Sequence, residues 1–227
     1  MKIKVNGINL FYEKAGADNG RPLILLHGNG EDHHIFDELA EKLRQNFTVY
    51  AVDSRNHGES ERTNDYSYET MMKDVYELIQ ALDLGPVNLI GFSDGAIISL
   101  LLAMKHGNEN VVSKMALLGM NLKPSDFTDE NYQYILELYD ETKDPLVQLM
   151  LEQPNIELEN LKKVTVPSLV VGAENDLFRQ GLFEEIATTL PNAELLMMNG
   201  HEHDSYVTHQ DVLYPELLRF FKESDYR

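Results

Sequence analysis

The most constraining feature of this 227-residue chain is the segment Gly91–Gly95, in which Gly-Phe-Ser-Asp-Gly places one serine between two glycines. A strand-like apolar run, 87–90, precedes it, and a helix-like apolar run, 96–104, follows it. Glycines at both flanks let the backbone double back where larger side chains would collide. The pattern therefore predicts a strand, a sharp turn and a helix, with the hydroxyl of Ser93 exposed at the turn. The alternative is an ordinary tight turn with a serine that caps the helix.

Two predicted strands further along, 167–172 and 193–198, are each followed by side chains that could make this serine reactive. A serine hydroxyl is a weak nucleophile until an imidazole accepts its proton and a carboxylate orients the imidazole. Carboxylates follow the first of these strands and histidines follow the second, at the strand ends where open α/β sheets collect functional groups. The order along the chain is thus serine, acid, histidine.

Two more loops follow predicted strands in the N-terminal part of the chain. Residues 27–30 read His-Gly-Asn-Gly after the run 23–26, and residues 53–60 read Asp-Ser-Arg-Asn-His-Gly-Glu-Ser after the run 48–52. With the serine turn and the chain order, these motifs resemble the α/β-hydrolase superfamily, in its single-domain serine esterase form with a short lid. The resemblance covers nearly the whole chain. One departure is Asn56, where the family motif usually has glycine, and it affects loop geometry rather than the catalytic assignment.

The resemblance implies roles for individual residues. Ser93 is the expected nucleophile, and the backbone N–H groups of Asn29 and Asp94 are the expected oxyanion hole. The family pattern places the acid at Asp176, although Glu174 stands two residues before it. The Asp94 side chain either lies beside the pocket, where it would contact substrate, or bonds to neighbouring loop groups.

Two histidines, His201 and His203, compete for the role of the base. A family branch with Gly-x-x-His-x-Ser-Tyr matches residues 200–206 with His203 as the base, whereas the commoner Gly-His pair points to His201. We therefore favour His203 and keep His201 as the alternative. Neither these histidines nor the run 32–34, Asp-His-His, has the spacing of a zinc site. We expect no metal and no other cofactor.

The expected fold class is α/β, with the α/β-hydrolase arrangement of a mostly parallel eight-stranded sheet and helices on both faces. Predicted strands and helices alternate after an opening hairpin, and right-handed crossovers then require a parallel sheet. The strands are expected near 3–6, 9–14, 23–27, 47–52, 87–91, 114–119, 167–172 and 193–198, and the helices near 33–44, 67–83, 93–106, 178–190 and 206–222. We expect one domain, 1–227, with a lid insertion at about 121–165.

The alternation of strand and helix lapses within this insertion, where two short helices are expected at about 128–141 and 144–152. The first begins with a threonine cap and an acidic first turn. A lid this short predicts a shallow or open pocket. Several of its larger side chains could contact substrate, or could instead pack the lid together: Phe127, Tyr132, Tyr134, Tyr139 and Met150.

The composition limits the partners. The chain has no cysteine, which excludes disulfides and Cys-based metal sites. It has no apolar stretch long enough for a signal peptide or a membrane span, so we expect a cytoplasmic location. A net charge of −19 disfavours nucleic acid and anionic membranes. The expected partner is a small-molecule ester substrate, and the oligomeric state is left open.

The expected function is hydrolysis of a small carboxylic ester through an acyl-enzyme. The same three groups could instead cleave a thioester or a carbon–carbon bond, or use peroxide, because the nucleophile chemistry is shared. A second class is a non-catalytic protein of this fold that binds a small ligand. The joint presence of serine, acid and histidine argues against that class.

Overall fold

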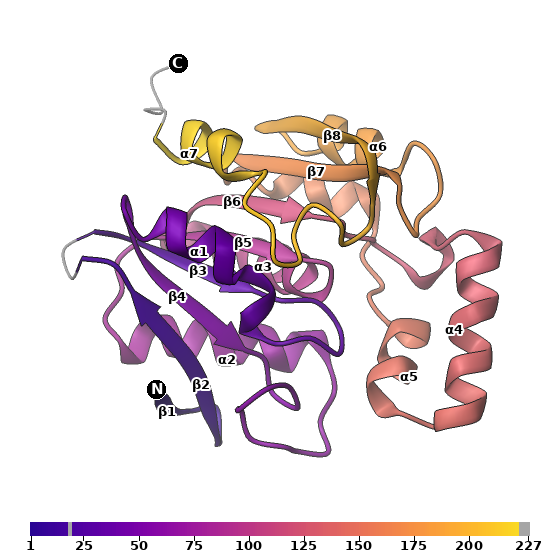
Figure 1. Cartoon of the computed structure of the whole chain (residues 1–227), viewed down its shortest axis with the longest axis horizontal. Helices are drawn as coiled ribbons and strands as arrows, with labels where there is room; N and C mark the ends of the chain where they lie inside the picture. Colours follow the sequence, from indigo (N-terminus) through magenta and orange to yellow (C-terminus); the bar gives the residue numbers. More distant parts are fainter. Residues whose placement is uncertain (18–19, 223–227) are drawn as a thin grey trace.

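The apolar runs pair into an eight-stranded sheet in the computed structural model, which describes residues 1–17 and 20–222 (Figure 1). The strands are β1 (Lys2–Val5), β2 (Ile8–Ala15), β3 (Arg21–Leu26), β4 (Phe47–Asp53), β5 (Val87–Phe92), β6 (Val112–Leu118), β7 (Ser168–Asn175) and β8 (Ala193–Glu202). Their order is β1-β2-β4-β3-β5-β6-β7-β8. The β1–β2 and β2–β4 pairs are antiparallel, and the remaining pairs are parallel. This sheet confirms the predicted α/β class.

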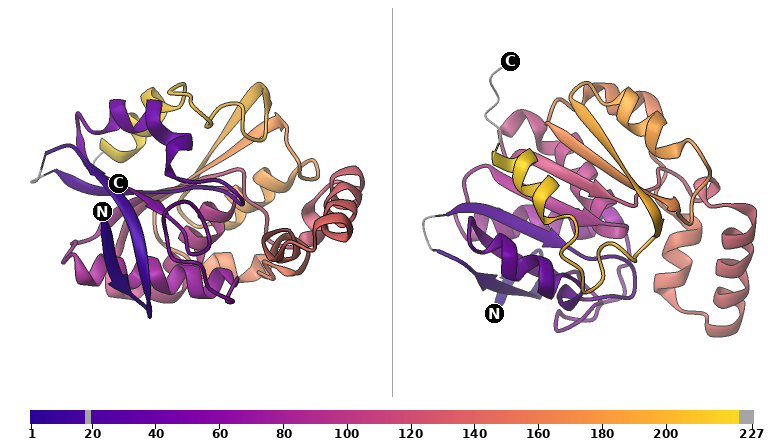
Figure 2. Two further views of the ribbon diagram at one scale, coloured as in Figure 1. Left: turned by 60° about the horizontal axis from the view of Figure 1, so that its bottom comes forward. Right: turned by 45° about the horizontal axis from the view of Figure 1, so that its top comes forward.

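Helices cover both faces of the sheet (Figure 2). In the described part of the chain they are α1 (Asp37–Leu43), α2 (Tyr68–Ala81), α3 (Asp94–His106), α4 (Asp129–Thr142), α5 (Pro145–Glu152), α6 (Leu182–Thr189) and α7 (Tyr214–Lys222), with short 3₁₀ turns at η1 (His33–Phe36), η2 (Gly107–Glu109), η3 (Pro124–Asp126) and η4 (Leu158–Lys163). None of these helices has both the length and the apolar character needed to cross a membrane.

Two apolar cores form, one on each face of the sheet. In β3, Leu23 and Leu25 belong to the core under α1 and α7, whereas Ile24 and Leu26 belong to the core under α2, α3 and α6. All four side chains have no exposed surface. Because a parallel strand with helices on both faces is buried on both sides, its sequence reads as a continuous apolar run rather than as an alternation. This is why the central strands could be located from the sequence.

The C-terminal helix differs from its prediction. It was expected over 206–222, but α7 begins only at Tyr214. Pro215 explains the later start, because proline lacks an N–H donor and is tolerated only in the first turn of a helix. The preceding residues form turns instead, with His209 at a positive φ of 53° and its N–H bonded to the carbonyl of Ile35.

The neighbouring elements also shift at their ends. The helix expected over 178–190 begins at Leu182, because Gly181 precedes it in the left-handed conformation at a φ of 82°. Strands β7 and β8 both run further than expected, to Asn175 and Glu202, and they pair with each other there after an irregularity in register. The functional side chains on these segments therefore lie at strand ends rather than in free loops.

The helices α4 and α5 form an antiparallel pair, here called the α4–α5 hairpin, beyond the carboxyl edge of the sheet (Figure 1). The two predicted ranges are confirmed to within one residue. Thr128 caps α4 by accepting a hydrogen bond from the N–H of Asn131, and Asp144 caps α5 in the same way from Leu146. Each helix of the hairpin thus begins directly after the capping residue in its sequence.

Candidate active site

Ser93 occupies the predicted sharp turn between β5 and α3. Its backbone has a φ of 50° and a ψ of −112°, which is a strained conformation for any residue with a side chain. A methyl group at Gly91 would lie 2.2 Å from the carbonyl oxygen of Gly95, and one at Gly95 would lie 2.0 Å from the carbonyl oxygen of Leu26. Both glycines are therefore required for the close approach of the backbone segments, as the sequence indicated.

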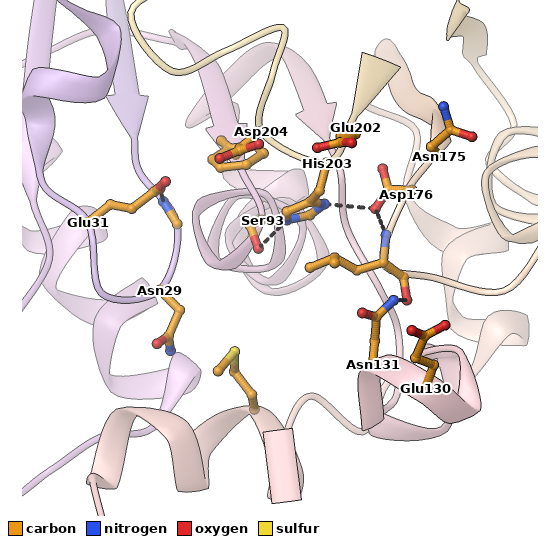
Figure 3. Close-up of a pocket in the computed structure, with 14 residues that line it drawn as sticks. Asn29, Glu31, Ser93, Glu130, Asn131, Asn175, Asp176, Glu202, His203 and Asp204 are labelled. Atoms are coloured by element: carbon orange, nitrogen blue, oxygen red, sulfur yellow. Dashed lines mark hydrogen bonds and ion pairs between the residues drawn. The ribbon is translucent and has the colours of Figure 1, made fainter. Parts of the chain in front are cut away.

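The side chains of Ser93, His203 and Asp176 form one hydrogen-bonded chain (Figure 3). His203 Nε2 lies 3.2 Å from Ser93 Oγ, and His203 Nδ1 lies 2.7 Å from Asp176 Oδ1. The Asp176 carboxylate accepts two further bonds, from the N–H groups of Ala173 and Leu177. A carboxylate that accepts from Nδ1 fixes the proton there, so Nε2 is left as the acceptor that faces the serine.

The alternative acid and base lie away from this chain. His201 Nδ1 bonds to Ser205 Oγ at 3.0 Å, and Glu174 accepts the N–H of Gly200 at 2.7 Å. The bond of Glu174 joins the ends of β7 and β8, and the ring of His201 on β8 reaches Ser205 in the turn that follows. The structure therefore brings His203 and Asp176 to Ser93, and it does not bring His201 or Glu174 there.

Aromatic packing holds the His203 ring in place. The rings of Phe92 and Phe178 lie with their centroids 5.0 Å and 5.4 Å from that of His203. On another side, the Cα of Gly119 is so close that a methyl group there would lie 2.9 Å from the imidazole. Packing on several sides restricts the imidazole to the orientation that reaches both partners.

The loop that contains Asn29 is fixed by two buried histidines. His57 Nε2 accepts the N–H of Gly30 at 3.1 Å, and His27 Nε2 accepts the N–H of Ser54 at 3.0 Å. Burial, together with the neighbouring His57, lowers the pKa of His27 to about 4, so its ring stays neutral and keeps its acceptor nitrogen. Both rings therefore act as structural hydrogen bonders.

Two backbone donors are available beside Ser93. Asp94 is the first residue of α3, so its N–H has no acceptor within the helix. The side chain of Asn29 holds its loop against this helix end, because Nδ2 donates to Asp94 Oδ2 at 3.0 Å. The same Nδ2 donates to the carbonyl oxygen of Leu146 at 3.0 Å, which joins the loop to the α4–α5 hairpin.

A cleft of about 660 Å³ opens in front of Ser93 and His203 (Figure 3). Acidic groups line it, and no Lys or Arg is among its lining residues in the described part of the chain, which are Gly28, Asn29, Glu31, Phe92, Ser93, Glu130, Asn131, Met150, Asn175, Asp176, Leu177, Glu202, His203 and Asp204. Burial raises the pKa of Glu31 to about 7. The sequence analysis missed Glu31, because no motif or periodicity sets it apart from other surface acids.

The side chain of Asp94 does not face this cleft. Its carboxylate accepts bonds from the hydroxyl of Tyr68 at 2.7 Å and from Asn29, and it lines a separate small cavity of about 30 Å³. Burial is the main cause of a raised pKa for this carboxyl, against the lowering effect of the bond from Tyr68. Of the two predicted arrangements for Asp94, the structure shows the one with neighbouring protein groups.

The predicted lid contacts are only partly placed at the cleft. Met150 lines both cavities, and Phe127 lines the small one. Tyr132 and Tyr139 line neither cavity in the described chain, and they pack against the apolar core instead. The helical spacing that selected them also selects residues that bury the inner face of α4, so a contact of either tyrosine with substrate stays a prediction. Tyr134 is 63% exposed.

The Asp32, His33 and His34 side chains bring their ligand atoms within 4.8 Å of one another. Each group already has a protein partner. Asp32 accepts the N–H of His34, the ring of His33 bonds to Asp53 at 2.8 Å, and the ring of His34 lies 3.2 Å from Asp37. We assign no metal ligands in this cluster.

Comparison with known proteins concerns the fold and the family of the chain. A family model described as the alpha/beta hydrolase fold matches residues 21–168. Serine hydrolase BPHL of Homo sapiens is similar at 29% identity over 205 residues, which cover 77% of this chain and 69% of that protein. AB hydrolase superfamily protein YisY of Bacillus subtilis (strain 168) is 36% identical over 113 residues, covering 49% of this chain and 41% of YisY. The chain thus matches less than half the length of that second relative.

A solved structure shares the whole fold. The enol-lactonase from Burkholderia xenovorans LB400 superposes with a TM-score of 0.82 and covers 98% of this chain and 100% of its own. The two sequences are 20% identical, so this likeness concerns the fold alone.

Proposed function

The chain belongs to the α/β-hydrolase fold family, and we propose that it is a serine hydrolase that cleaves small carboxylic esters through an acyl-enzyme. The single observation that supports this best is the continuous chain of bonds from Ser93 through His203 to Asp176, at 3.2 Å and 2.7 Å, at the floor of an open cleft. In this proposal Ser93 is the nucleophile, His203 the base and Asp176 the group that orients the base.

The reaction begins when Ser93 Oγ forms a bond to the acyl carbon and its proton passes to His203 Nε2. The carbonyl oxygen becomes an oxyanion, which the N–H groups of Asn29 and Asp94 stabilise. His203 then gives the proton to the alcohol oxygen as the bond from that oxygen to the acyl carbon breaks. A water molecule, deprotonated by His203, attacks the acyl carbon and releases the carboxylic acid and the free serine.

Each of the two proposed donors is fixed in place by its own structural element before substrate binds. The N–H of Asp94 belongs to α3, while the N–H of Asn29 belongs to a loop that His57 fixes through Gly30. Removing a donor of this kind costs about a hundredfold to a thousandfold in turnover, since such donors act on charge that appears only in the transition state. The side-chain bond from Asn29 to Asp94 keeps the two elements together.

We propose that the chain forms one hydrolase domain, 1–227, with the insertion at about 121–165 as its lid. The α4–α5 hairpin contributes Glu130, Asn131 and Met150 to the cleft, which is a small and largely polar contribution. Such a wall offers little apolar surface for a long acyl tail, so short acyl chains should be the better substrates.

The bond that is cleaved could differ while the three groups stay the same. A thioester, a lactone ring or a carbon–carbon bond next to a carbonyl would use the same nucleophile and base, and a perhydrolase would use peroxide in place of water. We propose the oxygen ester among these bonds, and turnover of the ester series described below tests that choice. A ligand-binding role without catalysis is the alternative from another class.

A series of aryl esters with acyl chains of increasing length tests the proposal. Measurable turnover that is highest for the short chains supports it, and labelling of Ser93 by an active-site-directed phosphonate, located by peptide mass spectrometry, identifies the nucleophile. A protein that turns over none of the esters and is not labelled at Ser93 would instead be a binding protein of this fold.

A further inference from the structure

Glu31 lies beside Ser93, on the side of the cleft opposite His203 (Figure 3). Its Oε2 accepts the N–H of Gly28 at 2.8 Å, so the carboxylate folds back over the loop that carries Asn29. A methyl group at Gly28 would lie 2.7 Å from Glu31 Oε2 and 3.1 Å from Ser93 Cβ. The carboxylate and the serine therefore flank the same glycine, and the proposed oxyanion donor Asn29 is the next residue.

The charged groups around Glu31 do little to stabilise a negative charge on its carboxylate. Burial is the main cause of the raised pKa of Glu31, against the lowering effects of the bond from the Gly28 N–H and of His203. The negative charges of Asp94 from α3 and of Asp204 from the turn after β8 raise this pKa further. On the hairpin side, Glu130 also lines the cleft. No Lys or Arg stands among the cleft-lining residues of the described chain. An ionised Glu31 close to the oxyanion would therefore repel it, with no Lys or Arg of the cleft lining to balance the two negative charges.

We propose that Glu31 gates the reactivity of Ser93 through its own proton: attack on the ester is fastest when Glu31 is a neutral carboxylic acid, and the ionised carboxylate slows it. This inference rests on the proposed function, because it concerns the same nucleophile. Glu31 acts here as a positioning and electrostatic residue, since it acts on the oxyanion through its charge and on the loop through Gly28.

An ionised Glu31 has two opposite effects on the transition state. It repels the oxyanion that forms near Asn29, and it attracts the imidazolium that forms at His203. His203 already has Asp176 as a counter-ion at 2.7 Å, so a second anion adds little for the imidazolium. The oxyanion has only the dipoles of N–H groups to stabilise it, so the repulsion prevails.

The consequence is an alkaline limb in the pH profile. Turnover is fastest with a protonated Glu31, whose pKa burial raises to about 7, so turnover falls as the pH rises past neutrality. Glu31→Gln keeps a carbonyl oxygen for the Gly28 N–H and carries no charge at any pH.

The test compares pH profiles of kcat/KM for a short aryl ester. Glu31→Gln should lose the alkaline limb, and at roughly pH 9 it should exceed the wild-type protein by about tenfold, a difference of the size that a nearby like charge produces in a partly screened site. Glu130→Gln is the matched control, because it removes another carboxylate of the same cleft while the alkaline limb should stay.

A second measurement titrates Glu31 without any substrate. Burial raises its pKa on folding from the ordinary 4.5 to about 7, so the folded protein holds this proton more tightly than the unfolded chain does. The wild-type protein should therefore lose thermal stability relative to Glu31→Gln as the pH rises through this interval. Above and below the interval, the difference should no longer change with pH.

The outcomes separate the two claims. An alkaline limb that is unchanged in Glu31→Gln, or a uniform loss of activity at all pH values, overturns the gate and leaves the serine hydrolase in place. A wild-type profile with no alkaline limb does the same without any variant. Absence of both turnover and phosphonate labelling of Ser93 in the wild-type protein overturns the proposed function, and the gate with it.

Discussion

The carboxyl edge of the sheet and the α4–α5 hairpin form opposite walls of the cleft, and they are held in different ways (Figure 3). At the sheet edge, the Asp176 carboxylate has three partners, namely His203 and the N–H groups of Ala173 and Leu177. The hairpin is joined to the body by a few bonds near its ends, and many of its polar groups bond within a single helix, as Gln133 does to Glu137.

The difference in the number of fixing bonds suits the two walls to different functions. Side chains whose position is determined by several partners can meet the distances that proton transfer requires. A segment with few tethers can move aside for a substrate at small cost in free energy. We therefore expect changes at the sheet edge to alter the chemical step, and changes in the hairpin to alter binding or local stability.

The largest effect is expected for Ser93→Ala. Loss of the nucleophile removes the acyl-enzyme route, so kcat should fall by about ten-thousandfold or more, while the small change in packing leaves the fold intact. Ser99→Ala is the matched control from the same helix, because the Ser99 hydroxyl only donates to the carbonyl of Gly95. Ester turnover and circular dichroism of both variants check this, and more than a tenth of wild-type turnover in Ser93→Ala would contradict it.

The second largest effect is expected for His203, which the sequence left in competition with His201 for the role of the base. His203→Ala should lower kcat by about a thousandfold or more, since it removes the base. His201→Ala should lower it less than about tenfold, because its ring bonds to Ser205 in the turn. Steady-state kinetics on both variants decide between them. If His201→Ala proved the worse of the two, the bonds to Ser93 and Asp176 described above would not be those used in catalysis.

The sheet with its covering helices and the α4–α5 hairpin should also differ in their contribution to stability. Ile186 in α6 and Ile135 in α4 are 0% and 5% exposed, so replacing either by alanine removes a similar amount of buried apolar surface. Ile186→Ala should cost about 2 to 5 kcal/mol of global unfolding free energy. Ile135→Ala should instead loosen the hairpin locally, with a smaller shift in Tm and faster amide exchange in α4. Equal losses of global stability would show that the hairpin unfolds together with the sheet.

The same contrast explains what could be predicted from the sequence. The serine turn and the central strands were predictable, because steric rules require glycine at Gly91 and Gly95 and burial on both faces requires apolar runs. The hairpin helices were also located, from Thr128 and the spacing that follows it. Helical spacing could not say which residues face the cleft and which face the core, and so it did not reveal that Tyr132 and Tyr139 pack against the core.

Glu31 and Asp94 show the remaining limit. Asp94 stood out because it follows the nucleophile, yet Tyr68, distant in the sequence, takes one of its carboxylate oxygens and holds it away from the main cleft. Glu31 gains its position from a local loop that returns its carboxylate to the N–H of Gly28. Neither arrangement follows from a motif. That of Asp94 depends on Tyr68, which only the folded chain brings near, and that of Glu31 depends on the conformation of an irregular loop.

The smallest effect is expected for a tether of the hairpin. Asn131 Nδ2 donates to the carbonyl oxygen of Leu177 at 3.1 Å, and Asn131 also lines the cleft. A hydrogen bond of this kind contributes about 1 kcal/mol, so Asn131→Ala should raise KM by about threefold to fivefold. The value of kcat should stay unchanged, because Asn131 has no bond to Ser93, His203 or Asp176 among those of the described residues.

The matched control is Gln133→Ala on the same helix, whose amide bonds only to the exposed Glu137 and which should leave both constants unchanged. Kinetics on a short aryl ester would compare the two variants with the wild-type protein. A fall in kcat for Asn131→Ala would mean that the hairpin takes part in the chemical step, because a loosened wall that only binds substrate changes KM alone. An unchanged KM would mean that the carbonyl of Leu177 finds water as an equal partner, and the hairpin would then be held by its apolar contacts rather than by this bond.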